Sequence, residues 1–330
     1  MTDNVSLKFF IAEKYDPYLN LAYEEYFQDT VSENEVILYL WQNADCVVIG
    51  KNQNAYRECH INKAKEDKVK IARRNSGGGA VFHDLGNLNF SFIAKKKNYN
   101  IQKQLSVIID ALNDLNIFAK ISGRNDIETD GKKISGNAFF YKKDNLLHHG
   151  TLLINTDPKK IQNYLNVNLI KLKAKNVSSV VSRVTTLSAI NENITLEKLR
   201  FSILSSFSKL YNYPLSEITK SDIDDSKIKK LFNKFSNEKF IFGENTTFEF
   251  TVEDRFDIGM LSICFNTNNG VIKKVSVFTD SLDYNISNEI SNAFLNKSFS
   301  KENLLDISLS IENENKIFKY VSKLLSKEVF

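Results

Sequence analysis

Cysteine, proline and glycine are all scarce in this chain of 330 residues. The 3 cysteines, Cys46, Cys59 and Cys264, show no CxxC spacing and cannot all pair, so the sequence predicts neither a disulfide framework nor a zinc site. We expect buried, inert thiols in a protein of a reducing compartment. Only 3 prolines and 12 glycines are present, yet three of the glycines are adjacent at 77–79, which an ordinary loop does not require.

Long apolar runs and a strong net charge are also missing. No run of about 18 apolar residues occurs, and the N-terminus has no basic segment followed by an apolar one, so we expect a cytoplasmic protein without a membrane segment. A net charge of +4 on 44 basic and 40 acidic residues is too small to predict nucleic-acid binding. The lysine runs at 95–97 and 171–175 are interpreted as solvated faces, with attraction of an acidic partner protein as the alternative.

The spacing of apolar residues predicts an α+β fold. Asp16 and Pro17 open a stretch with helical spacing, and β-branched runs at 36–41 and 46–50 are typical of paired strands in a central sheet. Further strands are predicted at 69–74, 87–94 and within 118–155, and further helices at 101–117 and 158–166.

The C-terminal part of the chain predicts a second, smaller domain. Apolar positions recur with helical spacing from 195 to 236, ahead of the polar stretch GENTT at 243–247. Three antiparallel strands follow, with a turn at 268–270, and helical stretches at 285–296 and 311–327 close the chain. We therefore predict a large domain at 1–246 and a small α+β domain at 247–330.

The most informative segment is ARRNSGGGAVFHD at 72–84. Glycines without a Cβ let the chain turn sharply and point successive amide N–H groups at one oxygen-rich group, while the arginines neutralise its charge. The segment therefore predicts a phosphate or carboxylate site, although it fits neither GxxxxGK[ST] nor, because of Phe82, GxGxxG. The alternative is a tight glycine turn beside ordinary surface arginines.

A second candidate site is formed by GRND at 123–126 and GKKISGNA at 131–138. A lysine beside a glycine turn can place its charge on an α-phosphate and on an adjacent carboxylate, which lowers the repulsion between two anions that must react. This chemistry suits formation of an acyl-adenylate. The alternative is that these lysines are solvent-exposed and have no role.

A third segment, HHGTLL at 148–153, contains two adjacent histidines. Neighbouring side chains of a strand point to opposite faces, so His148 and His149 cannot easily share a metal ion. With only His60 and His83 remaining, no metal site is predicted. We expect one histidine of the pair to be packed in the core and the other to line a ligand site.

In their order along the chain, these segments resemble the bacterial-type lipoate-protein ligase family. The resemblance begins near residue 8, reaches about residue 190, and continues at VFTDSLD, residues 277–283. It implies a large mixed-sheet domain of the biotin/lipoate ligase type with a small α+β C-terminal domain. It also implies a reaction in which lipoate and ATP, assisted by Mg²⁺, give lipoyl-AMP, whose lipoyl group is then transferred to an acceptor lysine. The motifs that carry the resemblance are KYDP (14–17), NADCVVIGKNQN (43–54), ARRNSGGGAVFHDLGNLNFSF (72–92), SGRNDI (122–127), KISGNAFF (133–140) and HHGTLLIN (148–155).

The resemblance also assigns site residues. Lys133 is implied to contact lipoate and nucleotide, and the KxSGxA register favours it over Lys132. Asp126 is implied to lie near the phosphates, and we hypothesise that it orients the acceptor amine or receives its proton. The nucleotide is expected at Arg74, Gly79, Ala80, Val81, Phe82, Asn87 and Lys133. Lipoate is expected at Ser76, Gly78, His83, Lys133 and His149.

The expected acceptors are lipoyl domains of 2-oxoacid dehydrogenase E2 subunits, the glycine-cleavage H protein, or both, and we expect a monomer. Three alternatives remain open: an octanoyl or lipoyl transferase that uses no ATP, a biotin ligase, and a non-catalytic lipoyl-domain binder. The absence of cysteine from 120–185 counts against the transferase, and a different glycine signature counts against the biotin ligase. The intact Lys133 and SGGG sequence count against the binder.

Overall fold

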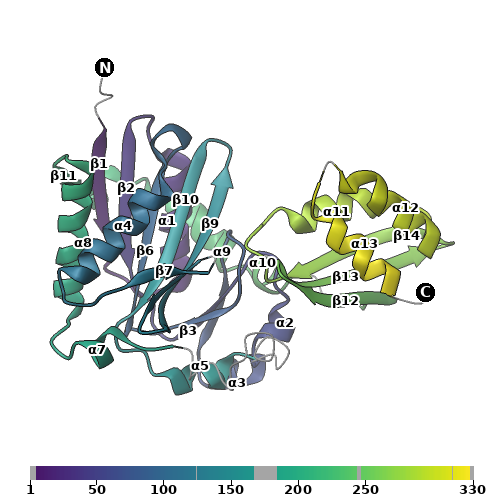
Figure 1. The fold of residues 1–330 in the computed structure, drawn as a ribbon, viewed down its shortest axis with the longest axis horizontal. Coiled ribbons are helices and arrows are strands. Elements are labelled where there is room, and N and C mark those ends of the chain that lie inside the picture. Colours follow the sequence, from purple (N-terminus) through teal and green to yellow (C-terminus); the bar gives the residue numbers. More distant parts are fainter. Residues whose placement is uncertain (1–4, 124, 167–183, 244–246, 314, 328–330) are drawn as a thin grey trace.

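The protein folds into two lobes, each built around its own sheet (Figure 1). The computed structural model describes residues 5–123, 125–166, 184–243, 247–313 and 315–327. The larger lobe contains a mixed eight-stranded sheet and a separate three-stranded sheet, and the smaller lobe contains one three-stranded sheet. The predicted α+β class is confirmed.

The eight-stranded sheet has the order β11-β1-β2-β6-β10-β9-β8-β7. β1 pairs in parallel with β2 and β11, and the remaining pairs are antiparallel. The strands are β1 (Ser6–Ile11), β2 (Glu35–Trp41), β6 (Asn87–Lys95), β7 (Lys120–Ser122), β8 (Asp126–Thr129), β9 (Lys132–Lys142), β10 (Asn145–Leu153) and β11 (Leu215–Glu217).

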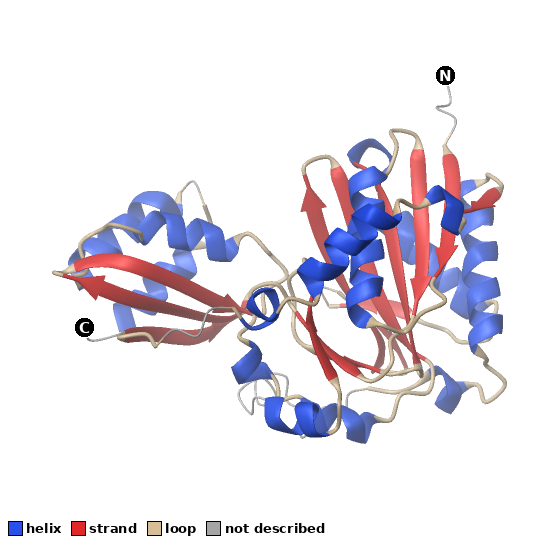
Figure 2. Cartoon of the chain, turned by 180° about the vertical axis from the view of Figure 1, so that it is seen from behind, coloured by secondary structure: helices blue, strands red, loops and turns tan. Residues whose placement is uncertain are grey.

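Both faces of this sheet are covered by helices, as Figure 2 shows. β2 is buried along its whole length, and its alternate residues enter different hydrophobic clusters. Leu38 joins the cluster that includes α4 (Ile101–Asn113) and α8 (Leu196–Tyr211), whereas Tyr39 joins the cluster that includes α1 (Pro17–Thr30) and α9 (Asp225–Phe235). The fully apolar run predicted as a central strand is therefore explained by burial on both sides.

The predicted opening helix is α1, and its start follows the expected chemistry. Pro17 occupies the first turn, and the Asp16 side chain accepts hydrogen bonds from the amides of Tyr18 and Leu19. The other helical elements of the larger lobe are α2 (Ala55–Glu58), α3 (Ile61–Glu66), η1 (Lys96–Asn98), α5 (Pro158–Tyr164), α7 (Leu187–Ile190), η3 (Lys220–Asp222) and α10 (Glu238–Phe242).

The smaller sheet of the large lobe supports the glycine-rich segment. β3 (Cys46–Ile49) lies between β4 (Lys70–Arg73), which is parallel to it, and β5 (Val81–His83), which is antiparallel. The segment between β4 and β5 contains the three adjacent glycines. We call residues 74–80 the glycine loop.

The small lobe is an antiparallel meander packed against helices. β12 (Phe250–Phe256), β13 (Gly259–Asn268) and β14 (Val271–Thr279) form the sheet, and their buried side chains share one cluster with α11 (Ile286–Phe294), α12 (Lys301–Glu312) and α13 (Phe318–Lys327). The three predicted antiparallel strands are confirmed. Along the part of the chain that the structure describes, no helix has both the length and the apolar character needed to cross a membrane.

Three sequence predictions of secondary structure were wrong. The runs at 36–41 and 46–50 are not paired with each other, because β2 lies between β1 and β6 in the eight-stranded sheet, whereas β3 lies between β4 and β5 in the separate three-stranded sheet. The stretch at 195–236 is interrupted by β11, because Asn212 ends α8 in the left-handed conformation and the following residues pair with β1. The stretch at 311–327 is not one helix. α12 begins ten residues earlier than that stretch, with Ser300 as its N-cap, and α13 begins after a break near Asn315.

Candidate active site

Two buried arginines, Arg73 just before the glycine loop and Arg74 at its first position, hold the backbone around it. Arg73 donates to the carbonyls of Gly50 and Lys51, among others. Arg74 donates to Ser76 Oγ at 3.0 Å and to the carbonyl oxygens of Gly77 and Gly79 at 2.6 and 2.8 Å. Burial lowers the pKa of Arg74 to about 10, so its guanidinium is still charged at neutral pH. The alternative of ordinary surface arginines is therefore wrong.

The glycines of this loop permit close contact with the small lobe. A Cβ on Gly77 would lie 2.5 Å from the carbonyl oxygen of Ser281, and Gly78 has a φ of +90°. The amide N–H of Gly78 donates to the Ser281 carbonyl at 2.8 Å. The expectation that successive loop amides face an anion is therefore wrong for Gly78 in this conformation, because that donor is bonded to the small lobe.

A cavity of about 390 Å³ lies between the two lobes, next to the glycine loop. Its volume falls in the usual range for a small-molecule site. Most of the predicted site residues line it, whereas Ser76 and Asn87 lie behind its wall. Its lining includes Leu21, Trp41, Val48, Arg74, Gly78, Gly79, Ala80, Val81, Phe82, His83, Asn89, Asn125, Asp126, Lys133, Asn137 and His149 from the large lobe, and Arg255, Ile258, Gly259, Asp280 and Leu282 from the small lobe.

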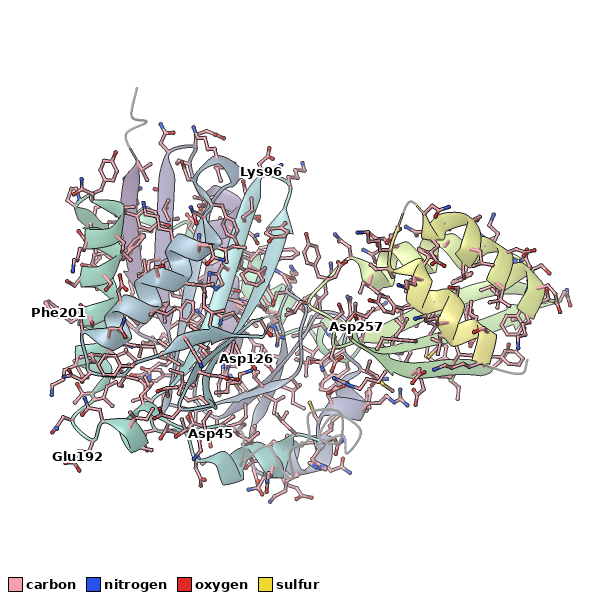
Figure 3. The ribbon with its side chains drawn as sticks, viewed as in Figure 1. Asp45, Lys96, Asp126, Glu192, Phe201 and Asp257 are labelled. Atoms are coloured by element: carbon pink, nitrogen blue, oxygen red, sulfur yellow. The ribbon has the colours of Figure 1, made fainter. Side chains whose placement is uncertain are left out.

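Lys133 and Asp126 form an ion pair in this cavity. Nζ of Lys133 lies 2.7 Å from Oδ1 of Asp126, which enters from the neighbouring strand β8. Lys132 is exposed and does not belong to the lining, so the structure brings the lysine favoured by the KxSGxA register to the cavity. Asp126, which is labelled in Figure 3, is the first residue of β8, next to the edge strand β7 of the eight-stranded sheet.

A buried amide network supports the strand that carries Lys133. Asn125 and Asn137 exchange hydrogen bonds with each other's backbone, and Asn137 Oδ1 lies 3.0 Å from Nε2 of His148. His148 packs between aromatic rings, and burial lowers its pKa to about 3. His148 is thus the packed histidine of the pair. The ring is neutral, and its Nδ1 and Nε2 lie 3.0 Å from the side-chain oxygens of Gln104 and Asn137.

The other histidine belongs to a second buried network beside the cavity. His149 Nε2 lies 2.7 Å from Ser76 Oγ, and its Nδ1 lies 2.8 Å from Oε1 of Glu24. Ser91 donates to the same Glu24 oxygen and accepts from Trp41 Nε1. The chain of bonds fixes the orientation of the His149 ring at the cavity wall.

This arrangement has the composition of a Ser-His-acid triad but not its accessibility. Ser76 is 0% exposed and is absent from the cavity lining. Its Oγ also accepts a hydrogen bond from Arg74 Nε. The network is therefore interpreted as a support for the cavity wall and not as a nucleophile.

His83 contributes a neutral donor to the same cavity. Asn43 Nδ2 lies 3.2 Å from Nδ1 of His83, and Asn43 Oδ1 already accepts from Asn20. His83 Nδ1 is therefore the acceptor, and the proton resides on Nε2, which is buried without a partner. Burial lowers the pKa of His83 to about 3, so the ring is uncharged.

Asn87 lies one step behind the cavity wall. Its side chain donates to Asn89 Oδ1 at 3.0 Å, and Asn89 lines the cavity. Sequence reasoning selected Asn87 and missed Asn89, Asn125 and Asn137, all of which stand inside the motifs that it quoted. It also missed Glu24, whose signal is weak because acidic residues on helices are common.

The cysteines lie away from the cavity. All three are buried, as expected, and burial raises the pKa of Cys59 to about 12 and that of Cys46 further. None belongs to the described cavity lining. A thiolate nucleophile of the kind that a carrier-dependent transferase uses is therefore not found among the described lining residues.

The acidic side chains of the lining are Glu58, Asp126 and Asp280. No group of three or more His, Cys, Asp or Glu residues within the described ranges is arranged to hold a metal ion by itself. Mg²⁺, however, is commonly held by one or two carboxylates together with substrate phosphates. The donor set therefore fits Mg²⁺ that arrives with a nucleotide.

Two family models together match most of the chain. The model described as "Lipoyl protein ligase A/B catalytic domain" matches residues 16–208, and "Bacterial lipoate protein ligase C-terminus" matches residues 245–327. The lipoate-protein ligase A of Blochmanniella floridana is 39% identical over 303 residues, which are 90% of this chain and 90% of that protein.

Two solved structures of similar fold are informative. LipL1 of P. falciparum, in complex with lipoate, has a TM-score of 0.84 at 31% identity, over 98% of this chain and 100% of its own. A bi-partite lipoate protein ligase of Thermoplasma acidophilum, described with its E2 lipoyl domain, has a TM-score of 0.63 at 26% identity, over 75% of this chain and 99% of its own. The expectation of the lipoate-ligase fold is confirmed.

Proposed function

Because this chain belongs to the lipoate-protein ligase family, we propose that its cavity joins lipoate to ATP as lipoyl-AMP and passes the lipoyl group to a lysine of an acceptor protein. The catalytic domain is assigned to 1–246 and the accessory domain to 247–330. One observation supports the proposal most directly: Lys133 lies in the cavity, paired with Asp126 at 2.7 Å.

Lys133 is proposed as the central residue of the first step. In that step a carboxylate oxygen of lipoate attacks the α-phosphorus of ATP, a new P–O bond forms, and the bond to pyrophosphate breaks. A cation between the two reacting anions lowers their repulsion and stabilises the charge of the transition state. Mg²⁺, when bound, neutralises phosphate charge, and Asp126 is the proposed protein ligand for it.

The nucleotide is proposed to bind along the strand that leaves the glycine loop. Residues 79–82 line the cavity, and the small residues Gly79 and Ala80 among them allow close approach of a phosphate or a base. Arg74 supports the nucleotide site indirectly, because its guanidinium donates to the carbonyl of Gly79. Asn87 also contributes indirectly, because its side chain donates to Asn89, which lines the cavity.

The lipoyl chain is proposed to lie against the apolar wall of the cavity. Leu21, Trp41 and Val48 supply apolar surface there, and His83 and His149 supply two polar edges. Ser76, which does not line the cavity, hydrogen-bonds to His149 and holds its ring in place. Gly78 lines the cavity without a side chain. The neutral state of His83 suits an uncharged acyl chain.

The second step requires an uncharged acceptor amine. Its nitrogen attacks the carbonyl carbon of lipoyl-AMP, the new amide bond forms, and AMP leaves. We propose that Asp126 orients this amine or takes its proton. The structural neighbour from T. acidophilum is described with an E2 lipoyl domain. On that basis, the proposed acceptors are lipoyl domains of 2-oxoacid dehydrogenase E2 subunits or the glycine-cleavage H protein. The proposed oligomeric state is a monomer.

The test is lipoate-dependent exchange of labelled pyrophosphate into ATP, without an acceptor protein. Lys133→Ala is expected to lower the exchange rate by roughly 10²- to 10³-fold, the usual loss when one charge-stabilising group is removed. Lys132→Ala is the matched control, because Lys132 is exposed outside the cavity, and it is expected to retain wild-type exchange. A folded wild-type protein without exchange contradicts the proposal.

A further inference from the structure

Arg255, which forms an ion pair with Asp280, brings a guanidinium with one unpartnered donor from the small lobe to the cavity. It stands near the end of β12, at the turn between β12 and β13, and its side chain belongs to the cavity lining. Its Nη1 is buried and has no hydrogen-bond partner. The carboxylate Oδ2 of Asp280 lies 3.6 Å away, beyond hydrogen-bonding distance. A buried donor of this kind normally has a partner, which points to a ligand.

Asp280 is engaged elsewhere. Its Oδ1 accepts from the backbone amide of Met260 at 2.7 Å, and a Cβ on Gly259 would lie 2.5 Å from the same oxygen. The carboxylate thus fixes the start of β13 and lies near Arg255 without satisfying its Nη1. The guanidinium therefore lies beside a fixed carboxylate, and its Nη1 has no hydrogen-bond partner.

The distribution of charge in the cavity suggests what this edge binds. Among the described lining residues, the arginines and lysines are Arg74, Lys133 and Arg255. Arg74 donates to the carbonyls of the glycine loop, and Lys133 is paired with Asp126 and assigned to the α-phosphate. A triphosphate has two further phosphoryl groups that require neutralisation. Besides Mg²⁺, Arg255 is the cationic side chain of the described lining that has not been assigned a role.

We propose, on the basis of the function proposed above, that Arg255 binds the β- and γ-phosphates of ATP from the small lobe and stabilises the pyrophosphate that leaves. The planar guanidinium donates two parallel hydrogen bonds to phosphate oxygens, which gives strength and orientation. When the carboxylate oxygen of lipoate bonds to the α-phosphorus, the electron pair of the breaking P–O bond moves to pyrophosphate. Arg255 neutralises that growing charge.

Contacts between the lobes hold Arg255 in this position. Gly78 donates to Ser281, and the amide of Thr279 donates to the carbonyl of Asn52 at 2.9 Å. The Tyr284 ring packs against Phe140 with centroids 4.8 Å apart. Figure 3 shows Asp257, in the turn that follows β12, at the junction of the two lobes. The docked small lobe therefore places the β12–β13 turn next to the cavity.

The test separates binding of the outer phosphates from binding of the rest of the nucleotide. Calorimetric titration compares α,β-methylene-ATP with AMP, for wild type and Arg255→Gln. Loss of a hydrogen-bonded charge pair predicts roughly ten- to hundredfold weaker binding of the triphosphate analogue and unchanged binding of AMP. Lys273→Gln, an exposed charge of the same lobe, is the matched control and is expected to bind both ligands as the wild type does.

Two further measurements distinguish a phosphate ligand from a structural residue. Arg255→Gln is expected to lose lipoate-dependent pyrophosphate exchange and to retain transfer of the lipoyl group from supplied lipoyl-AMP. Arg255→Lys is expected to recover part of the analogue affinity. Equal affinity of Arg255→Gln and wild type for the analogue, or a parallel loss for AMP, would overturn the inference. If wild type itself shows no exchange, the proposed function fails instead.

Discussion

Gly136 shapes the candidate site by leaving room for another residue. A Cβ at this position would lie 2.7 Å from Nζ of Lys133 and 3.1 Å from its Cε. The lysine side chain therefore passes directly over the glycine on its way to Asp126. The glycine of the KxSGxA pattern therefore leaves the space that the Lys133 side chain occupies.

We predict that Gly136→Ala lowers the exchange rate by roughly one to two orders of magnitude, because a small displacement of a positioned group is costly. The free energy of unfolding should change by less than about 1 kcal/mol, because a flexible side-chain end and no backbone atom meets the new methyl group. Pyrophosphate exchange and urea denaturation measure the two quantities. Wild-type exchange in this variant would show that Lys133 tolerates displacement.

Some residues of the site could be predicted from the sequence and others could not. Lys133 and Asp126 stand in glycine-rich segments with charge, a pattern whose chemistry is readable. Asn89 and Asn137 carry no such signal, because asparagine is frequent in this chain and a single amide specifies no chemistry. The bond from Gly78 to Ser281 joins residues about two hundred positions apart, so no local pattern announces it.

At the scale of elements, β10 shows how strand alternation separates two identical residues. His148 enters the aromatic core and His149 lines the cavity, as the period of two requires. The sequence predicted this division but not which histidine takes which side, because the choice depends on the neighbouring strands. β11 was missed for a related reason, since its three residues pair only with β1 at a sheet edge.

Stability should depend on pH through these elements. Burial lowers the pKa of His148 to about 3 from a usual value near 6.5, so the unfolded chain binds the proton and the folded chain does not. The corresponding stability is present above about pH 6.5 and is lost as the pH falls from there toward about 3. The slope is at most about 1.4 kcal/mol per pH unit for each such histidine.

Urea denaturation of wild type and His148→Gln at several pH values between 7 and 4 measures this contribution. His83, with a similarly lowered pKa, remains in both proteins and keeps part of the slope. We expect the variant to be less stable at pH 7 but to lose less stability on acidification. Identical slopes in the two proteins would refute this assignment of the proton uptake.

At the scale of the whole molecule, the glycine loop is the surface on which the small lobe docks. Gly77 meets the backbone of Ser281 and Leu282 at distances that exclude any side chain, whereas a Cβ on Gly79 would meet nothing within 4 Å. Two neighbouring glycines therefore serve different purposes. The sequence indicated the glycine cluster but not the different roles of Gly77 and Gly79. These roles depend on contact with Ser281 and Leu282, which lie more than two hundred positions later in the chain.

Gly77→Ala is predicted to separate the lobes. The methyl group would displace backbone atoms of the small lobe, so hydrogen exchange at residues 279–284 should become faster and the radius of gyration larger in X-ray scattering. Gly79→Ala is the matched control and should keep the compact arrangement, because its methyl group has free space. A compact Gly77→Ala protein with unchanged hydrogen exchange would mean that the glycine loop shifts to accommodate the methyl group while the lobes stay docked.

The shared wall of the cavity also bears on the order in which the protein becomes functional during synthesis. The large core is assembled from residues that leave the ribosome early, while Arg255, Asp280 and Leu282 emerge late. Domains generally fold as units from the N-terminus onward, so the large lobe can fold while the cavity still lacks one side. A nascent chain therefore carries Lys133 before it carries a closed cavity, and we expect the proposed activity to require the last part of the chain.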